Sequence, residues 1–142
     1  MAIPSAKKLS AELAELAESP ALIASERGTA TLASALASRS APVLAQAAKL
    51  VAEPRVRGLE EPMRAAYRAL AGDRAQSIDA GAHAKEALVA ALEAVEDVDA
   101  TLFAEAASCV QLERARGGSR DTAAGVRTRG ALGLARLGHP DL

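Results

Sequence analysis

Side chains that could do nucleophilic, acid–base or metal chemistry are few and scattered in this chain. The two histidines, His83 and His139, have no Cys, second His or paired carboxylate at helical spacing, whereas a metal site needs several converging ligands. The single cysteine, Cys109, lies among small residues and is interpreted as a buried small hydrophobe. The Gly-Gly-Ser at 117–119 lacks the strand-to-helix elbow that holds a nucleophilic serine. The sequence therefore predicts no enzyme, no metal site and no cofactor.

Charge placement is the most informative feature. Residues 79–113 contain eight acidic side chains and one lysine, whereas residues 114–136 contain six arginines and one aspartate. One interpretation is that neighbouring helices of opposite charge attract each other and set their packing. The other is an anion or acidic-peptide site, where the amides of a helix start meet arginine side chains. The candidate residues for that site are Arg116, Gly117, Gly118, Arg120, Arg127 and Arg129.

Two observations limit the anion-site interpretation. Asp121 precedes the expected helix and would compete for the same amides as a capping residue. Nucleic acid is disfavoured, because no aromatic side chains interleave with the arginines for stacking and the adjacent acidic stretch would repel phosphate. The net charge of −1 also gives no global basic field for nucleic acid or an acidic membrane.

The composition predicts an all-α fold. Half of the residues are hydrophobic, yet the chain has one Tyr, one Phe and no Trp, so Ala, Leu and Val supply the core. Ala and Leu are the best helix formers, and no stretch alternates in the manner of a strand. The N-terminus has no apolar run, so neither a signal peptide nor a membrane anchor is expected. With a single cysteine, this favours a reducing, cytoplasmic location.

Proline, glycine and capping residues divide the chain into helices. Ser5 is expected to cap a first helix that ends near residue 18, and residues 21–27 form a short turn. Residues 114–120 are expected to be neither helix nor strand, because paired glycines favour neither. The other expected helices form three consecutive pairs, which are 29–38 with 41–53, 59–71 with 82–96, and 100–113 with 123–137.

Residues 41–51 and 125–141 resemble the second helix of a HEAT repeat. Such helices have Val-Arg near their start, as at Val126-Arg127, and they close with a Leu-Gly-x-Pro-Asp turn, as at 137–141. The Gly-Gly-x-x-Asp-Thr-Ala-Ala segment at 117–124 is similar to that of a group of uncharacterised bacterial HEAT-repeat proteins. The resemblance covers roughly residues 28–142. It implies an armadillo-like α-α superhelix of about three helix pairs, with residues 1–27 as an N-terminal helical cap.

This resemblance implies a scaffold that binds another protein or peptide without catalysis. The second helices of such stacks line a concave face, so Gln46, Lys49, Glu86, Arg127 and Arg129 are expected to contact the partner, together with the Gly-Gly loop. The alternatives are a helical-repeat enzyme, or a binder of nucleic acid or another anionic ligand through the Arg-rich Gly-Gly loop.

The C-terminal turn carries a further expectation. A Leu-Gly-x-Pro-Asp turn normally leads into another repeat, whereas here the sequence stops. The last helix has Leu132, Leu134 and Leu137 spread around it rather than a polar outer face. The chain is therefore expected to be a fragment of a longer solenoid, with self-association through this uncovered helix as a further possibility.

Overall fold

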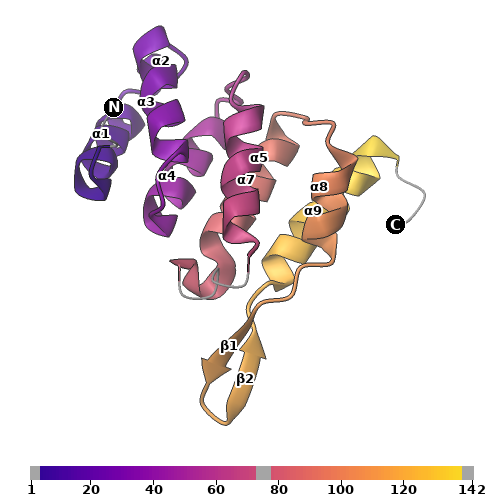
Figure 1. The fold of residues 1–142 in the computed structure, drawn as a ribbon. Coiled ribbons are helices and arrows are strands. Elements are labelled where there is room, and N and C mark those ends of the chain that lie inside the picture. The colour runs from indigo at the N-terminus through magenta and orange to yellow at the C-terminus, as the bar shows by residue number, and fades with distance from the viewer. Residues whose placement is uncertain (1–3, 73–77, 139–142) are drawn as a thin grey trace.

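The computed structural model describes residues 4–72 and 78–138, and most of these residues are helical, as the composition predicts (Figure 1). The helices are α1 (Ala6–Glu18), α2 (Pro20–Ile23), α3 (Glu26–Leu36), α4 (Ala41–Ala52), α5 (Glu60–Leu70), α7 (His83–Ala94), α8 (Ala100–Ala107) and α9 (Ala124–Leu137). A 3-10 turn, η1 (Ala80–Ala82), precedes α7, and strands β1 (Leu112–Ala115) and β2 (Gly118–Asp121) form a hairpin.

Side-chain caps explain where several helices begin. Ser5 accepts a hydrogen bond from the Lys8 amide at 3.2 Å, which confirms the expected start of α1. Asp99 accepts from the Leu102 amide at 3.1 Å and caps α8 in the same way. Pro42 lies in the first turn of α4, where its missing N–H costs no hydrogen bond.

The helices pack in three consecutive pairs. Helix α3 contacts α4, α5 contacts α7, and α8 contacts α9, while α4, α7 and α9 contact one another in that order. Helices α1 and α2 cover the N-terminal pair, with Leu9 and Leu13 fully buried. The largest core side chains are Tyr67 and Phe103, and the rest are mainly Leu, Val and Ala. Burial of these apolar faces is the main favourable term that holds the pairs together.

Glycines allow an unusually close approach of α9 to α8. A Cβ on Gly130 would lie 2.4 Å from the Ala107 amide nitrogen, and one on Gly133 would lie 2.3 Å from the Phe103 ring. On the same helix Leu134 is buried and Leu132 is half-exposed. The expected continuation of the solenoid past α9 stays a prediction, because His139, Pro140 and Asp141 lie outside the described residues.

The prediction for residues 100–120 was wrong in two respects. Helix α8 ends at Ala107 rather than at Glu113, and the Gly-Gly segment lies inside an antiparallel hairpin rather than in an irregular loop. Gly117 and Gly118 have φ values of 88° and 141°, which residues with a Cβ rarely adopt. Arg116 and Gly117 form the two-residue turn, and Gly118 begins β2 opposite Ala115, so the paired glycines do not exclude strands here.

In the described ranges, none of the helices combines the length and the apolar character that crossing a bilayer requires.

Candidate functional site

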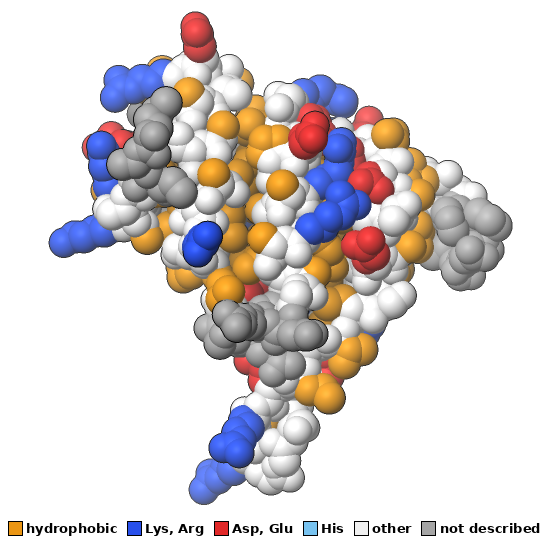
Figure 2. Space-filling model, viewed as in Figure 1, with side chains coloured by type: hydrophobic (Ala, Val, Ile, Leu, Met, Phe, Trp, Pro, Cys, Tyr) orange, Lys and Arg blue, Asp and Glu red, His pale blue; other side chains and the backbone are white. Residues whose placement is uncertain are grey.

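The residues predicted to bind an anion lie in two places. Arg116, Gly117, Gly118 and Arg120 are on the exposed hairpin, which projects from the helical body and carries basic side chains near its free end (Figure 2). Arg127 and Arg129 are instead on α9, where Arg129 is exposed and Arg127 is half-buried.

Arg127 is engaged within the protein. Its Nη1 lies 2.6 Å from Asp121 Oδ2 and donates to the Cys109 carbonyl at 2.8 Å. The Oδ1 of Asp121 accepts from the amides of Ala123 and Gln111, both at 3.1 Å. These amide bonds, and then Arg127, hold the pKa of Asp121 below its usual value. Arg127 therefore fixes the root of the hairpin. Asp121 accepts from the amide of Ala123, the residue before α9, but it does not cap the first turn of α9 as the sequence predicted.

The hairpin arginines are not engaged in this way. Arg114, Arg116 and Arg120 are exposed and form no ion pair with any described residue. Arg120 lies opposite Glu113 in the strand register, but that carboxylate accepts its hydrogen bonds from other groups. The hairpin thus presents unneutralised positive charge to solvent.

A groove of about 370 Å³ crosses α4, α7 and α9. Its lining consists of Lys49, Ala52, His83, Glu86, Ala87, Ala90 and Arg129. Three of the residues expected on a concave face, Lys49, Glu86 and Arg129, therefore do lie together. The sequence did not predict His83 on this surface. His83 is exposed and lies there because α7 packs between α4 and α9.

Gln46 was expected on the same surface but faces another part of the protein. Its side-chain oxygen accepts from the Ser10 hydroxyl at 3.1 Å, and its amide nitrogen donates to the Ser10 carbonyl at 3.3 Å. Gln46 therefore ties α4 to α1 instead of lining the groove. The cause is its position on α4, on the side of the helix that α1 covers.

The charged side chains of the groove differ in whether they have a favourable partner. Glu86 points its carboxylate at the first turn of α9, since a Cβ on Gly125 would lie 2.5 Å from it. Carboxylates are favoured there by the amides and dipole of a helix start. Lys49 and Arg129 are exposed and pair with no carboxylate among the described residues. The groove therefore offers two cations without ion-pair partners among the described residues, an imidazole and the Glu86 carboxylate, together with three alanines.

A buried polar cluster at the root of the hairpin also escaped the sequence analysis. Glu113 Oε2 accepts from the Gly81 amide at 2.8 Å, from Gln111 Nε2 at 3.0 Å, and from the Thr122 hydroxyl. These bonds, led by that of Thr122, lower the pKa of Glu113. Asp79 accepts from the amides of residues 84 and 85 and so caps α7. The sequence predicts Glu113 at the end of a helix, so these contacts were not expected.

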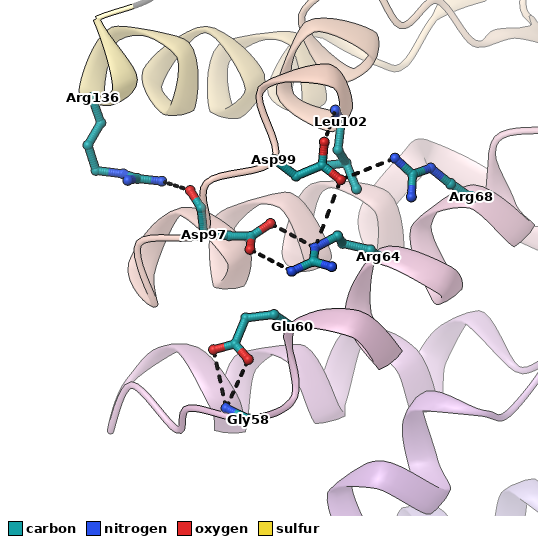
Figure 3. A network of polar contacts seen from close by, with 8 residues as sticks. All are labelled: Gly58, Glu60, Arg64, Arg68, Asp97, Asp99, Leu102 and Arg136. Carbon is teal, nitrogen blue, oxygen red and sulfur yellow. Dashed lines mark hydrogen bonds and ion pairs between the residues drawn. The ribbon is translucent and has the colours of Figure 1, made fainter.

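A second polar network lies at the opposite end of α7 (Figure 3). Asp97 is 5% exposed and accepts from Arg64 Nε and Nη2 at 3.0 and 2.9 Å, which raises the pKa of Arg64. Arg68 pairs with Asp99 at 3.2 Å, and Arg136 donates to the Asp97 carbonyl. This network joins α5, the turn after α7, and α9, and its charges are matched by partners, so its role is structural.

The comparisons with known proteins give no relative. No family model matches the chain, and no curated protein or solved structure matches it either. The resemblance to HEAT-repeat proteins therefore stays a prediction. Within residues 4–72 and 78–138, no group of three His, Cys, Asp or Glu side chains is placed to hold a metal ion.

Proposed function

We propose that this chain is a non-catalytic helical-repeat module that binds an acidic segment of another protein in the groove across α4, α7 and α9. The observation that carries the proposal is the pair of cations, Lys49 and Arg129, in one groove, where neither has an ion-pair partner among the described residues. The location that fits such a module, with its single cysteine, is the cytoplasm.

The arrangement of the helices supports a HEAT-like superhelix as the frame of this module. Each expected pair is in contact, and the second helices of the three pairs, α4, α7 and α9, lie next to one another. Stacks of this kind use the surface of their second helices to bind extended partners. The groove lies on that surface.

The groove also favours a partner of a particular chemistry. Two basic side chains can each pair with a carboxylate at the polar rim, where opposite charges guide association and fix register. The floor is formed by Ala52, Ala87 and Ala90, whose small side chains leave room for apolar groups of the partner. Among the described residues that line the groove, no Ser, Thr or Cys accompanies His83 as a nucleophile. These features support binding rather than catalysis.

The test is binding of a fluorescein-labelled Glu/Ala peptide, followed by fluorescence anisotropy at low and at moderate salt. The wild-type chain is expected to bind it, and Lys49→Ala with Arg129→Ala together should weaken binding by about tenfold, or roughly 1.4 kcal/mol. Arg39→Ala removes an exposed charge outside the groove and serves as the matched control. The proposal fails if the wild type does not bind the peptide, or if the control weakens binding as much as the double variant.

A second candidate function rests on the hairpin. Arg114, Arg116 and Arg120 project from the body on a two-stranded arm, where they could follow a polyanion such as single-stranded nucleic acid. An oligonucleotide titration separates this function from the first. Replacing these three arginines with alanine should then abolish oligonucleotide binding and leave the Glu/Ala peptide bound. Equal oligonucleotide affinity before and after the replacement would eliminate the second candidate.

A further inference from the structure

The cysteine of this chain lies beside a buried lysine. Lys85 Nζ is 3.8 Å from Cys109 Sγ, although the two residues are 24 positions apart in the sequence. Lys85 belongs to the first turn of α7, and Cys109 lies in the segment that joins α8 to β1. The packing of α7 against the hairpin root is what brings the amine to the sulfur.

The environment of Lys85 is unusual for a lysine. The residue is 2% exposed, yet its amine has no carboxylate within ion-pair distance among the described residues. The amine has one hydrogen-bond partner among the described residues, the sulfur of Cys109, which is a weak acceptor. The charge of Lys85 helps to lower the pKa of Glu113 from beyond ion-pair distance, but no carboxylate contacts the buried ammonium, and such burial is costly. The position therefore indicates a chemical role for the amine.

Cys109 differs from Lys85 in its access to solvent. It is a free thiol of intermediate exposure between two exposed residues, Ser108 and Val110. Tyr67 lies on its other side, where burial and then Cys109 raise the pKa of the phenol. A small reagent can thus reach the sulfur from solvent, while the buried amine is accessible to the sulfur alone. The low exposure of Lys85 favours reaction that begins at the more exposed sulfur.

We propose that Cys109 and Lys85 form a sulfur–nitrogen crosslink when hydrogen peroxide oxidises the thiol. In the first step the thiol sulfur takes one oxygen from peroxide, which gives a sulfenic acid and releases water. In the second step the Lys85 nitrogen, once its ammonium proton has passed to solvent, attacks the sulfur, the S–O bond breaks, and the hydroxyl leaves as water with one of the two remaining amine protons. Overall the pair loses two hydrogens and peroxide is reduced to two molecules of water. An added thiol reverses the linkage, because it supplies the two electrons that restore Cys109 and Lys85.

This modification would act on the hairpin. Cys109 is three residues before β1, and its carbonyl already accepts from Arg127 of α9. A covalent bond to Lys85 would therefore tie the root of the hairpin to α7 as well as to α9. The crosslink is independent of the proposed groove function, since neither residue lines the groove.

The experiment is peptide mapping of the full chain after treatment with excess hydrogen peroxide. Remaining thiols are blocked, the protein is digested without reductant, and the digest is searched for a peptide joining Cys109 to Lys85. Its expected mass is about 2 Da below the sum of the two unmodified peptides, because two hydrogens are lost. Dithiothreitol should release both peptides unchanged. Mapping is preferable to intact mass, since Met1 and Met63 also gain oxygen.

Two variants separate the crosslink from ordinary thiol oxidation. Lys85→Leu removes the amine and keeps an apolar side chain of similar size, so Cys109 should proceed to the sulfinic acid instead of forming the linked peptide. Lys49→Leu, at an exposed lysine, should leave the linked peptide intact. The wild-type digest shows whether the linked peptide forms even if Lys85→Leu does not fold. The proposal is overturned if wild-type Cys109 resists peroxide, forms only a disulfide between chains, or reaches the sulfinic acid without linkage to Lys85.

Discussion

The two ends of α7 are both held by buried polar groups, but they are held differently. At its C-terminal end, Asp97 accepts two hydrogen bonds from Arg64, and Arg68 pairs with Asp99 (Figure 3). At its N-terminal end, Asp79 and Glu113 accept mainly from backbone amides and neutral side chains. The buried cation there, Lys85, has no carboxylate partner among the described residues.

The difference indicates which end is structural and which can react. Removing one partner of a buried, well-matched ion pair strongly destabilises the fold, because the other charge is left without a partner. A buried cation without a contacting carboxylate carries a desolvation cost, so an apolar group of similar size should replace it without loss of stability. We therefore assign the C-terminal network to stability and the N-terminal cluster to positioning of the hairpin and to chemistry at Cys109.

The largest effect is expected at Asp97. Asp97→Ala leaves Arg64 without its bidentate partner, and we expect the free energy of unfolding to fall by about 3 kcal/mol in urea denaturation. Arg57→Ala is the control, because its ion pair with Glu96 is exposed on both sides and should change stability by less than about 0.5 kcal/mol. Equal effects of the two substitutions would remove the distinction between the networks.

Replacing Lys85, at the other end of α7, should change the free energy of unfolding in the opposite direction from replacing Asp97. Lys85→Leu is expected to raise the free energy of unfolding by about 1 kcal/mol, because it removes the desolvation cost of the amine and retains apolar packing. Arg64→Leu should instead lower it, since Asp97 would then be buried without a partner. Destabilisation by Lys85→Leu as large as that by Arg64→Leu would show that both cations serve stability.

Glu113 should make stability depend on pH. Its pKa is lowered in the folded protein, so its contribution is complete above the ordinary carboxyl pKa and is lost as the pH falls through the lowered value. Glu113→Gln should therefore lower the urea midpoint at pH 7, and the difference from wild type should shrink in acid. Glu18→Gln, at an exposed position on α1, provides the control. A difference that stays constant from neutral to acid pH would contradict the assignment.

The smallest effect is expected outside both clusters. Arg120 on β2 is exposed and unpaired among the described residues, so Arg120→Ala should change stability by no more than about 0.5 kcal/mol. Thermal or urea unfolding measures this. A loss of several times that amount would mean that the hairpin is part of the cooperative core.

The helices were predictable because their signals are local. Ser5, Asp99 and the helix-start proline Pro42 mark boundaries that follow from backbone chemistry within a few residues. The pairing of helices also followed from their order and short connections. The hairpin was missed because paired glycines are consistent both with a loop and with a hairpin in which Gly117 is in the turn and Gly118 begins the second strand. Only the pairing of the flanking residues distinguishes these cases.

The candidate sites were less predictable because they depend on contacts that are distant in sequence. Lys49, His83 and Arg129 meet only when α4, α7 and α9 pack side by side. Lys85 and Cys109 likewise lie on different elements. The sequence around each of them is that of an ordinary core or surface residue, so their contact could not be predicted. Charge asymmetry drew attention to α7 and α9, but it could not say which arginines are paired.

The most direct test of the proposed binding surface is a charge swap in the groove. We expect the variant that combines Lys49→Glu with Arg129→Glu to stop binding the Glu/Ala peptide and to bind a matching Lys/Ala peptide instead. Fluorescence anisotropy measures both. Retention of the Glu/Ala peptide at wild-type affinity would contradict the central claim that the groove across α4, α7 and α9 is where this protein binds its partner.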